Sequence, residues 1–250
     1  MGKSTIALGI DVGGTGIKGA PVDLDKGAFA DDRLRIPTPD VATPEAVCDV
    51  VAEIAGQFNL GKSTPVGITL PAVVTHGVAR SAANIDESWI GCHAEDLFEE
   101  RLGRDVTILN DADAAGVAER QYGAARKQDG LVILTTLGTG IGSAMLVDGV
   151  LVPNTELGHL ELDGHDAESR AASSAREREE LSWQEWAERL TRYYRHVEDL
   201  FWPDLFVVGG GVSKQADSFL PLLDIRTPIV PAKLKNKAGI VGAAYLAARG

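Results

Sequence analysis

The sequence predicts an α/β fold with two lobes around a central cleft, and an internal repeat is the main evidence. The repeated element is an apolar strand, a glycine-rich loop with a Thr-Gly pair and a second strand. Apolar runs bounded by glycine turns are typical of buried strands. Two copies, one in each half, indicate two related lobes with a ligand cleft between them. In the first copy the strand, loop and second strand are 5–12, 13–16 and 17–22, and in the second copy they are 131–137, 138–140 and 141–147.

The elements between the repeats follow from local signals. Thr43 before Pro44 is typical of a helix start, and this helix is expected to run to Phe58. A helix is also expected from the end of strand 106–109 to about Tyr122, because Gly123 then ends it. Three further strands are expected at 29–36, 66–70 and 205–208, and a small-residue helix at 239–248.

Ser182 and Glu185 form a capping-box pattern at the start of an amphipathic helix. Its apolar face recurs at helical spacing. That face consists of Trp186, Leu190, Tyr193, Val197 and Leu200. The charged stretch 176–180 just before it is interpreted as a solvated helix or loop.

We place the border between the lobes near residue 108. The small lobe then comprises 1–108 with the C-terminal helix, about 237–250, and contains the first glycine loop. The large lobe, 109–236, contains the second loop.

Composition excludes several classes of protein. The net charge of −12 disfavours binding to nucleic acid or to anionic membranes, because the mean field repels both. Two scattered cysteines, Cys48 and Cys92, form no disulfide framework or zinc cluster and fit a reducing compartment. No apolar run reaches the roughly 20 residues that span a bilayer, and no signal peptide is evident. We therefore expect a soluble, cytoplasmic protein.

The glycine loops favour phosphate as the ligand, because they expose backbone N–H groups with no Cβ in the way. Neither loop fits a Walker motif, which ends in Gly-Lys-Ser/Thr, or a dinucleotide fingerprint, since a strand follows. Asp11, which opens the first loop, is a candidate to hold magnesium through water. Asp111, after Asn110 at a strand end, is a candidate base for a hydroxyl acceptor. Helix capping is the alternative role for this Asn-Asp pair.

With these motifs the chain resembles the ROK family of sugar kinases, and within it the actinobacterial polyphosphate glucokinases. The resemblance covers nearly the whole chain and implies the actin-like, hexokinase-like (ribonuclease H-like) fold. It rests on the segments 11–18, 81–86, 109–114, 137–142, 156–159 and 208–213.

The resemblance implies roles for individual residues. Asp111 would be the catalytic base that takes the proton of the glucose 6-hydroxyl. The residues implied to bind the sugar are Asn84, Asn110, Asp111, Glu156 and His159. Those implied or expected to bind phosphate or nucleotide are Asp11, Gly13, Gly14, Thr15, Gly16, Lys18, Gly138, Thr139, Gly140, Gly209, Gly210, Gly211 and Lys214.

The chain departs from the family at one motif. Many ROK kinases follow the Glu-x-Gly-His element with a cysteine-rich zinc motif, whereas no cysteine follows Cys92 here. His159 therefore has no thiolate partners, and we expect no zinc. The role of Glu161 stays open. Beyond Asp224 the chain has no acidic residue, which suits a polyanion. The candidates to contact it are Lys18, Lys214, Lys233, Lys235 and Lys237, with ordinary surface lysines as the alternative.

The expected reaction is phosphorylation of glucose, with mannose as a second acceptor, by inorganic polyphosphate and also ATP, with Mg²⁺. A homodimer is implied by the resemblance alone. The alternative is a strictly ATP-dependent kinase for another hexose. A transcriptional repressor of the same family is disfavoured because the first motif begins at residue 11, which leaves no room for a helix-turn-helix. A sugar sensor without catalysis is disfavoured by the presence of Asp111 and both loops.

Overall fold

The computed structural model describes residues 6–249, and within them the chain forms two compact units. Unit 1 comprises residues up to Ala118 and from Lys237 onward, and unit 2 runs from Glu119 to Asn236. The border thus lies inside a helix, whereas the sequence analysis places it before that helix, at 108. The reason is that the first turns of the helix belong to the packing of unit 1. Thr5 and Gly250, at the ends of the predicted elements, lie outside the described residues.

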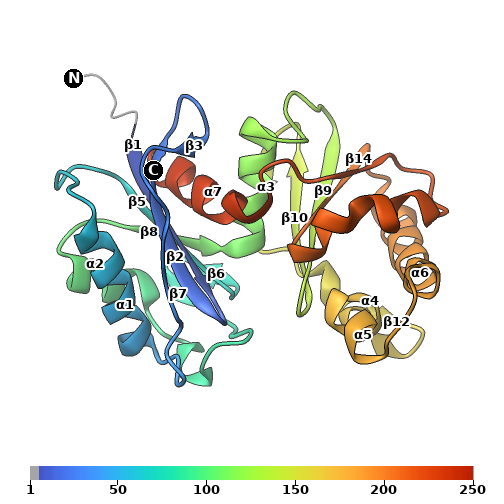
Figure 1. Ribbon diagram of the computed structural model, residues 1–250, viewed down its shortest axis with the longest axis horizontal. Helices are drawn as coiled ribbons and strands as arrows, with labels where there is room; N and C mark the ends of the chain where they lie inside the picture. The colour runs from blue at the N-terminus through green and yellow to red at the C-terminus, as the bar shows by residue number, and fades with distance from the viewer. Residues whose placement is uncertain (1–5, 250) are drawn as a thin grey trace. The chain divides into compact units, whose positions relative to one another are not determined.

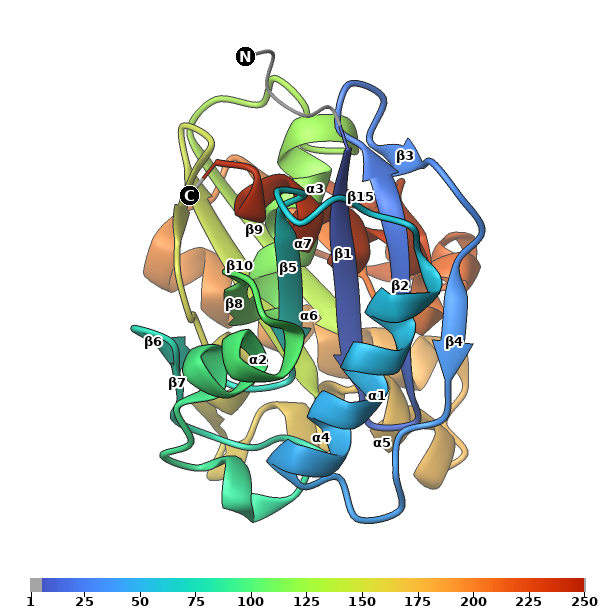
Figure 2. The same cartoon turned by 90° about the vertical axis from the view of Figure 1, so that its left-hand side faces the viewer.

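Unit 1 is built on a six-stranded sheet with the order β3-β2-β1-β5-β8, in which β4 also pairs with β2. The first two strands form an antiparallel hairpin, and β5 and β8 then add in parallel. Figure 2 shows β2, β1 and β5 side by side, with α1 in front of them. The strands are β1 (Ile6–Gly13), β2 (Gly16–Asp23), β3 (Ala28–Phe29), β4 (Leu34–Ile36), β5 (Val66–Leu70) and β8 (Thr107–Asn110), with a separate hairpin of β6 (Val74–Thr75) and β7 (Val78–Ala79).

Helices cover both faces of this sheet (Figure 1). On one face α1 buries Val47, Val51 and Ile54 against the strands, together with Phe98 of α2. The predicted start of α1 is confirmed, because the Thr43 hydroxyl accepts the backbone N–H of Ala46. The helices of unit 1 are α1 (Pro44–Gln57), η1 (Glu87–Trp89), α2 (Ala94–Leu102), the start of α3 (Asp111–Tyr122), η5 (Lys235–Lys237, at the border) and α7 (Ala238–Ala247).

Helix α7 lies so close to the other face that glycine is required beneath it. A Cβ built on Gly9 would lie 1.9 Å from the carbonyl oxygen of Ile240, and one on Gly67 would lie 2.1 Å from that of Ala243. Gly242 of α7 in turn faces the carbonyl oxygen of Ala114 in α3, where a Cβ would lie 1.8 Å away. The close packing expected of the small-residue helix is therefore confirmed.

Unit 2 repeats the plan, with a five-stranded sheet of order β11-β10-β9-β14-β15. Again an antiparallel hairpin, β9 with β10, is extended by parallel strands. The strands are β9 (Leu131–Leu137), β10 (Ile141–Val147), β11 (Val150–Val152), β14 (Leu205–Gly209) and β15 (Ile229–Pro231), with a small hairpin of β12 (Glu161–Leu162) and β13 (His165–Asp166). The helices are η2 (Leu157–His159), α4 (Glu168–Ala171), α5 (Ser173–Arg178), α6 (Trp183–Phe201), η3 (Gly211–Ser218) and η4 (Leu220–Leu222).

The capping box at the start of α6 is present in full, with Ser182 and Glu185 each bonding to the other's backbone N–H. The helix buries Trp186, Leu190 and Tyr193 in the core of unit 2, as predicted. The prediction that Leu200 belongs to the apolar face was wrong, because Leu200 is 52% exposed. Phe201 continues the buried face instead. The step from Val197 to Phe201 is four residues, which keeps both on one side of the helix.

One further strand expectation was wrong, and one helix was not predicted. The strand expected at 29–36 is divided into β3 and β4 by the exposed residues Asp31, Asp32 and Arg33, which turn away from the sheet. Helix α2 was missed because its sequence is rich in acidic residues and its apolar stripe is weak. Gly103, which ends α2 in the left-handed conformation, was the available signal.

A buried carboxylate joins the two stretches of chain at the border on the unit 2 side. Glu119 is fully buried and accepts three backbone N–H groups, from Ala124 at 2.6 Å, Lys233 at 3.1 Å and Leu234 at 2.7 Å.

Among the helices of the described chain, none combines the length and apolar character needed to cross a membrane.

Candidate functional site

The first glycine loop is the tight turn between β1 and β2, where Gly13 pairs with Gly16. Asp11, near the end of β1, lies between two partners. Its Oδ2 is 3.3 Å from the Nζ of Lys18, and its Oδ1 accepts the hydroxyl of Thr69 at 3.0 Å. Two of the residues predicted for phosphate and metal binding are thus paired with each other.

Asn84 lies beside this loop. A Cβ built on Gly14 would come within 3.1 Å of the backbone oxygen of Asn84, and the Asn84 backbone is left-handed, with φ at 59°. Arg35 closes the other side, donating to the carbonyl oxygen of Thr15 at 2.8 Å. The structure therefore places one predicted sugar residue next to the first predicted phosphate loop, from a segment distant in sequence.

Asn110 and Asp111 occupy the junction of β8 and α3, as the sequence predicts. The side-chain Oδ1 of Asn110 accepts the N–H groups of Ala112 at 2.8 Å and Asp113 at 3.1 Å. Its side-chain Nδ2 donates to the carbonyl oxygen of Ala72 at 3.1 Å. Asn110 is therefore the cap of the helix. Asp111 is the first helical residue, and its carboxylate accepts the N–H of Ala112 at 2.8 Å. The positive end of the helix dipole stabilises a carboxylate at this position.

The second glycine loop joins β9 to β10 and is held by the short helices α4 and α5. Ser174 contributes two contacts: its N–H donates to the Gly138 carbonyl at 3.1 Å, and its hydroxyl donates to the Thr139 carbonyl at 2.6 Å. Glu168 accepts the N–H of Ile141 at 2.8 Å. Sequence reasoning missed both supporting residues, which lie far along the chain from the loop.

A pocket of about 290 Å³ lies against this loop within unit 2. It brings together three of the predicted phosphate residues, Gly138, Thr139 and Gly211, whereas Lys214 does not line it. Gly210 is required here, because its φ is 81° and a Cβ would lie 2.3 Å from the carbonyl oxygen of Leu137. The remaining lining residues are Leu137, Ser173, Ser174, Arg176, Glu177, Val212 and Gln215.

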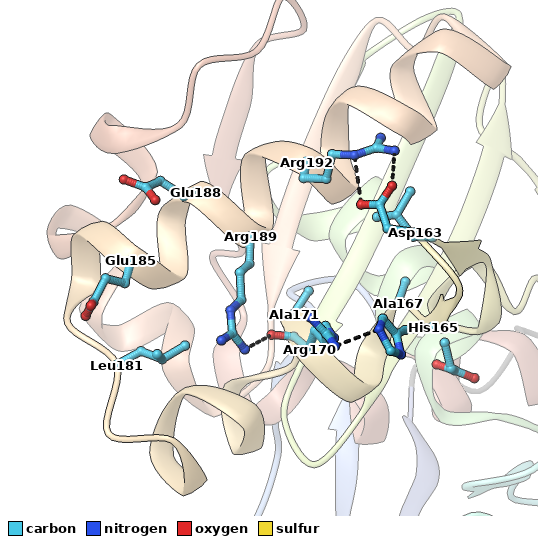
Figure 3. A pocket seen from close by; sticks show the side chains of 12 residues that line it. Asp163, His165, Ala167, Arg170, Ala171, Leu181, Glu185, Glu188, Arg189 and Arg192 are labelled. Atoms are coloured by element: carbon cyan, nitrogen blue, oxygen red, sulfur yellow. Dashed lines mark hydrogen bonds and ion pairs between the residues drawn. The ribbon is translucent and has the colours of Figure 1, made fainter.

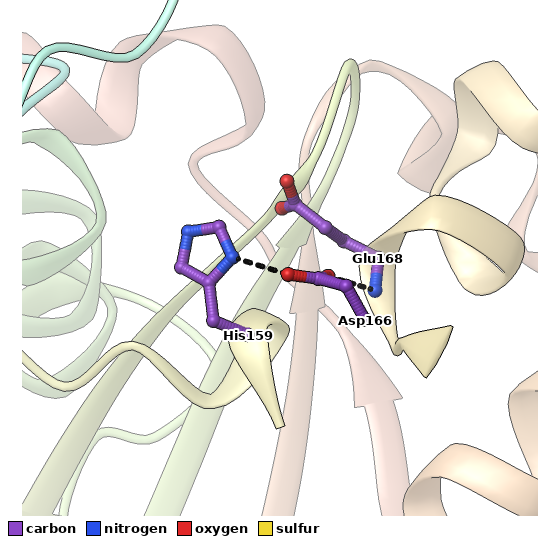
Figure 4. Close-up of side chains that lie close together, drawn as sticks. All are labelled: His159, Asp166 and Glu168. Carbon is purple, nitrogen blue, oxygen red and sulfur yellow. Dashed lines mark hydrogen bonds and ion pairs between the residues drawn. The ribbon is translucent and has the colours of Figure 1, made fainter. Parts of the chain in front are cut away.

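His159 lies on η2 with a carboxylate on each side. Its Nδ1 donates to Asp166 at 2.8 Å, and its Nε2 is 3.9 Å from Glu156 (Figure 4 shows the Asp166 contact). The hydrogen bond to Asp166 raises the pKa of His159, while burial raises the pKa of Glu156. The structure thus brings together the two predicted sugar residues of unit 2 and adds Asp166.

His159 and Asp166, together with Glu168, form the one candidate metal cluster in residues 6–249. One ligand atom each from His159, Asp166 and Glu168 lie within 4.8 Å of one another (Figure 4). Each already has a hydrogen-bond partner, since Asp166 also accepts the N–H of Glu168 at 3.2 Å and Glu168 accepts that of Ile141. No thiolate takes part, so the cluster lacks the soft ligands of most structural zinc sites.

Another pocket of unit 2, about 490 Å³, lies apart from the second glycine loop (Figure 3). It lies between α4 and α6, and none of the residues predicted to bind sugar or phosphate lines it. Its arginines are held by protein groups: Arg192 binds Asp163 with two hydrogen bonds, and Arg170 contacts the His165 ring at 2.6 Å. Its size alone therefore gives no reason to place the reaction there.

Four of the five lysines predicted to contact a polyanion are exposed, whereas Lys18 is half-buried beside Asp11. Lys214, Lys233 and Lys235 belong to unit 2, and no carboxylate forms an ion pair with them in the described part of the chain. Lys237 belongs to unit 1, where its ammonium lies 5.2 Å from the ring centroid of Phe29.

Comparison with known proteins gives consistent results. The model of the ROK family matches residues 7–171. The polyphosphate glucokinase of Mycobacterium tuberculosis is 56% identical over 95% of this chain and 89% of its own length. The crystal structure of an inorganic polyphosphate/ATP-glucomannokinase from Arthrobacter sp. strain KM is 55% identical, with a TM-score of 0.94 over 98% of this chain and 99% of that one. A Streptomyces griseus ROK glucokinase, solved with glucose and AMPPNP, shares the fold at 24% identity, with a TM-score of 0.81 over 98% of this chain and all of that one.

Proposed function

This chain belongs to the ROK family, and on that basis we propose that it transfers a phosphoryl group from inorganic polyphosphate or ATP to the 6-hydroxyl of glucose. The observation that carries the proposal is 53–56% identity to polyphosphate glucokinases over 95% of the chain. The fold is the two-domain, actin-like fold of ROK sugar kinases. Mannose is a second acceptor by analogy with the glucomannokinase structure.

In the proposed mechanism Asp111 removes the proton of the sugar hydroxyl. Its place at a strand end and at the start of α3 fits this role, because the hydrogen bond from the N–H of Ala112 fixes the position of the carboxylate. Asn110, fixed by three hydrogen bonds to backbone, holds the turn that presents Asp111. Glu156, His159 and Asn84 are proposed to bind the other sugar hydroxyls.

The glycine loops are proposed to bind the donor through backbone N–H groups, which stabilise the charge that develops on the transferred group. Mg²⁺ would neutralise donor phosphate charge when bound. Both oxygens of Asp11 already accept protein hydrogen bonds, and the side chain is 21% exposed, so it fits a contact through a metal-bound water. Removal of divalent cations with a chelator should abolish turnover, and added Mg²⁺ should restore it.

We further propose a cytoplasmic location, because Cys48 and Cys92 are both free thiols, which fits a reducing compartment. The homodimer stays a prediction, which light scattering on the purified protein tests.

The deciding experiment is the initial rate of glucose 6-phosphate formation with ATP-free polyphosphate and Mg²⁺, beside a parallel ATP reaction. Turnover with both donors is expected. Turnover with ATP alone would remove polyphosphate from the proposal, and no turnover with either donor would contradict the glucokinase function and require other sugars to be tested.

A further inference from the structure

Arg176 of α5 lines the pocket beside the second glycine loop and is held there by aromatic rings. Its guanidinium carbon lies 3.7 Å from the ring centroid of Trp183. Trp183 stacks on Phe219 at 6.0 Å, and Phe219 packs against the buried Trp186 at 4.9 Å. Cation–π stacking on rings that reach the core of unit 2 fixes the guanidinium without consuming its hydrogen-bond donors.

Arg176 differs from the other arginines of α5 and α6, both of which are described in full. The other four each pair with a carboxylate: Arg178 and Arg189 with Glu179, Arg192 with Asp163, and Arg195 with Asp224. Within residues 6–249 no carboxylate lies at ion-pair distance from Arg176, and its buried Nε has no hydrogen-bond partner. Because an aromatic face is neutral, the positive charge of Arg176 is not compensated by its partner.

The pocket itself is suited to an anion. Around Arg176 it presents the backbone of the Gly138-Thr139 loop and of Gly211, together with Ser173 and Ser174. Glu177 is the single acidic lining residue, and its side chain is exposed. A guanidinium offers a planar set of donors that matches two oxygens of one phosphate group.

We infer that Arg176 binds the phosphoanhydride chain of the donor, through phosphates that are not transferred, in this pocket of unit 2. The inference rests on the proposed function, which makes the neighbouring loop the donor site. Polyphosphate and the nucleoside triphosphate share this chemistry, so Arg176 serves both donors and does not contribute to glucose binding.

The test compares Arg176→Gln with Arg178→Gln, which removes the same charge two residues away on the same helix, where Glu179 is the partner. Loss of a charge-assisted hydrogen bond should raise the KM for polyphosphate and for ATP roughly tenfold or more in Arg176→Gln. The KM for glucose should stay within about twofold. Arg178→Gln should leave all three within about twofold, and equal effects of the two variants would overturn the inference.

Calorimetric titration with tripolyphosphate and with AMPPNP, without glucose, separates binding from turnover. Both ligands should bind Arg176→Gln at least about tenfold more weakly than wild type. Weakening for AMPPNP alone or for tripolyphosphate alone would overturn the shared role. Should Arg176→Gln fail to fold, Arg176→Lys carries the test, because it keeps the charge but loses the planar fork. It should weaken tripolyphosphate binding about threefold or more, and unchanged affinity would overturn the inference.

The two proposals can fail separately. A wild-type protein that binds both ligands but phosphorylates no glucose would contradict the proposed function, while the Arg176 variants would still decide this inference. A wild-type protein that turns over both donors with an unaffected Arg176→Gln variant would contradict this inference alone.

Discussion

The Nδ1 of His159 lies 2.8 Å from the Oδ2 of Asp166, so the carboxylate determines which ring nitrogen carries the proton. Asp166 also accepts the N–H of Glu168, which in turn accepts the N–H of Ile141 at the end of the second glycine loop. A chain of hydrogen bonds therefore connects a proposed sugar ligand to a proposed phosphate loop inside unit 2.

Asp166→Asn should lower the pKa of His159 toward its ordinary value, because the hydrogen bond to the carboxylate is the largest cause of the raised pKa. A raised pKa in the folded state stabilises folding where the imidazolium forms. This stabilisation is complete below the unfolded pKa of about 6.5 and is lost as the pH rises through the higher folded pKa. Titration of the His159 ring by NMR measures the shift.

Unfolding experiments test the same pH dependence of folding stability. The difference in unfolding free energy between wild type and Asp166→Asn should be greatest at pH 5–6 and should shrink at higher pH, where the ring is neutral in both proteins. The asparagine oxygen can still accept the N–H of Glu168, so this hydrogen bond is retained in the variant. A difference that does not vary with pH would show that Asp166 does not act through the charge of His159.

Asp111→Asn should reduce kcat by roughly a hundred- to ten-thousandfold, because an amide cannot accept the hydroxyl proton. Glucose binding should be largely kept, since the amide is the same size and its oxygen still accepts the N–H of Ala112. Steady-state kinetics with glucose titrated by calorimetry gives both quantities. Turnover near that of wild type would remove Asp111 from the role of base.

These residues show what the sequence could predict. Asn110 and Asp111 were predictable because a strand end, a helix cap and an acidic residue coincide within a few positions. Ser174 and Glu168 were not, because their contacts with the glycine loop join segments that no local pattern relates. Arg176 lies in the stretch 176–180 that was interpreted as a solvated helix or loop, but its stacking on Trp183 depends on how α5 turns into α6.

Gly67→Ala should destabilise the protein by about 1–3 kcal/mol, because the added Cβ would meet backbone of α7 that cannot move aside. Gly56→Ala is the matched control, since nothing lies within 4 Å of its added Cβ and alanine has the higher helix propensity in the last turn of α1. The control should leave stability unchanged or raise it by at most about 1 kcal/mol. Urea unfolding of both variants compares them directly, and similar behaviour would show that α7 adjusts freely.

The triple variant Lys233/Lys235/Lys237→Ala should weaken the use of polyphosphate more than the use of ATP. A long polyanion contacts more surface charge than a nucleotide does, and these side chains are exposed. The ratio of kcat/KM for the two donors is the measurement, repeated at two salt concentrations because charge contacts weaken with ionic strength. An unchanged ratio would leave the three lysines as ordinary surface residues.

The position of α7 has a consequence for how the protein is made. Unit 2 is continuous in sequence, so it is synthesised whole before the last helix. Folding of unit 1 is completed later, because the face of its sheet that bears Gly9 and Gly67 stays uncovered until Ala238–Ala247 emerges. Synthesis from the N-terminus therefore makes the first strands of unit 1 early, whereas the helix that covers this face of their sheet is made last.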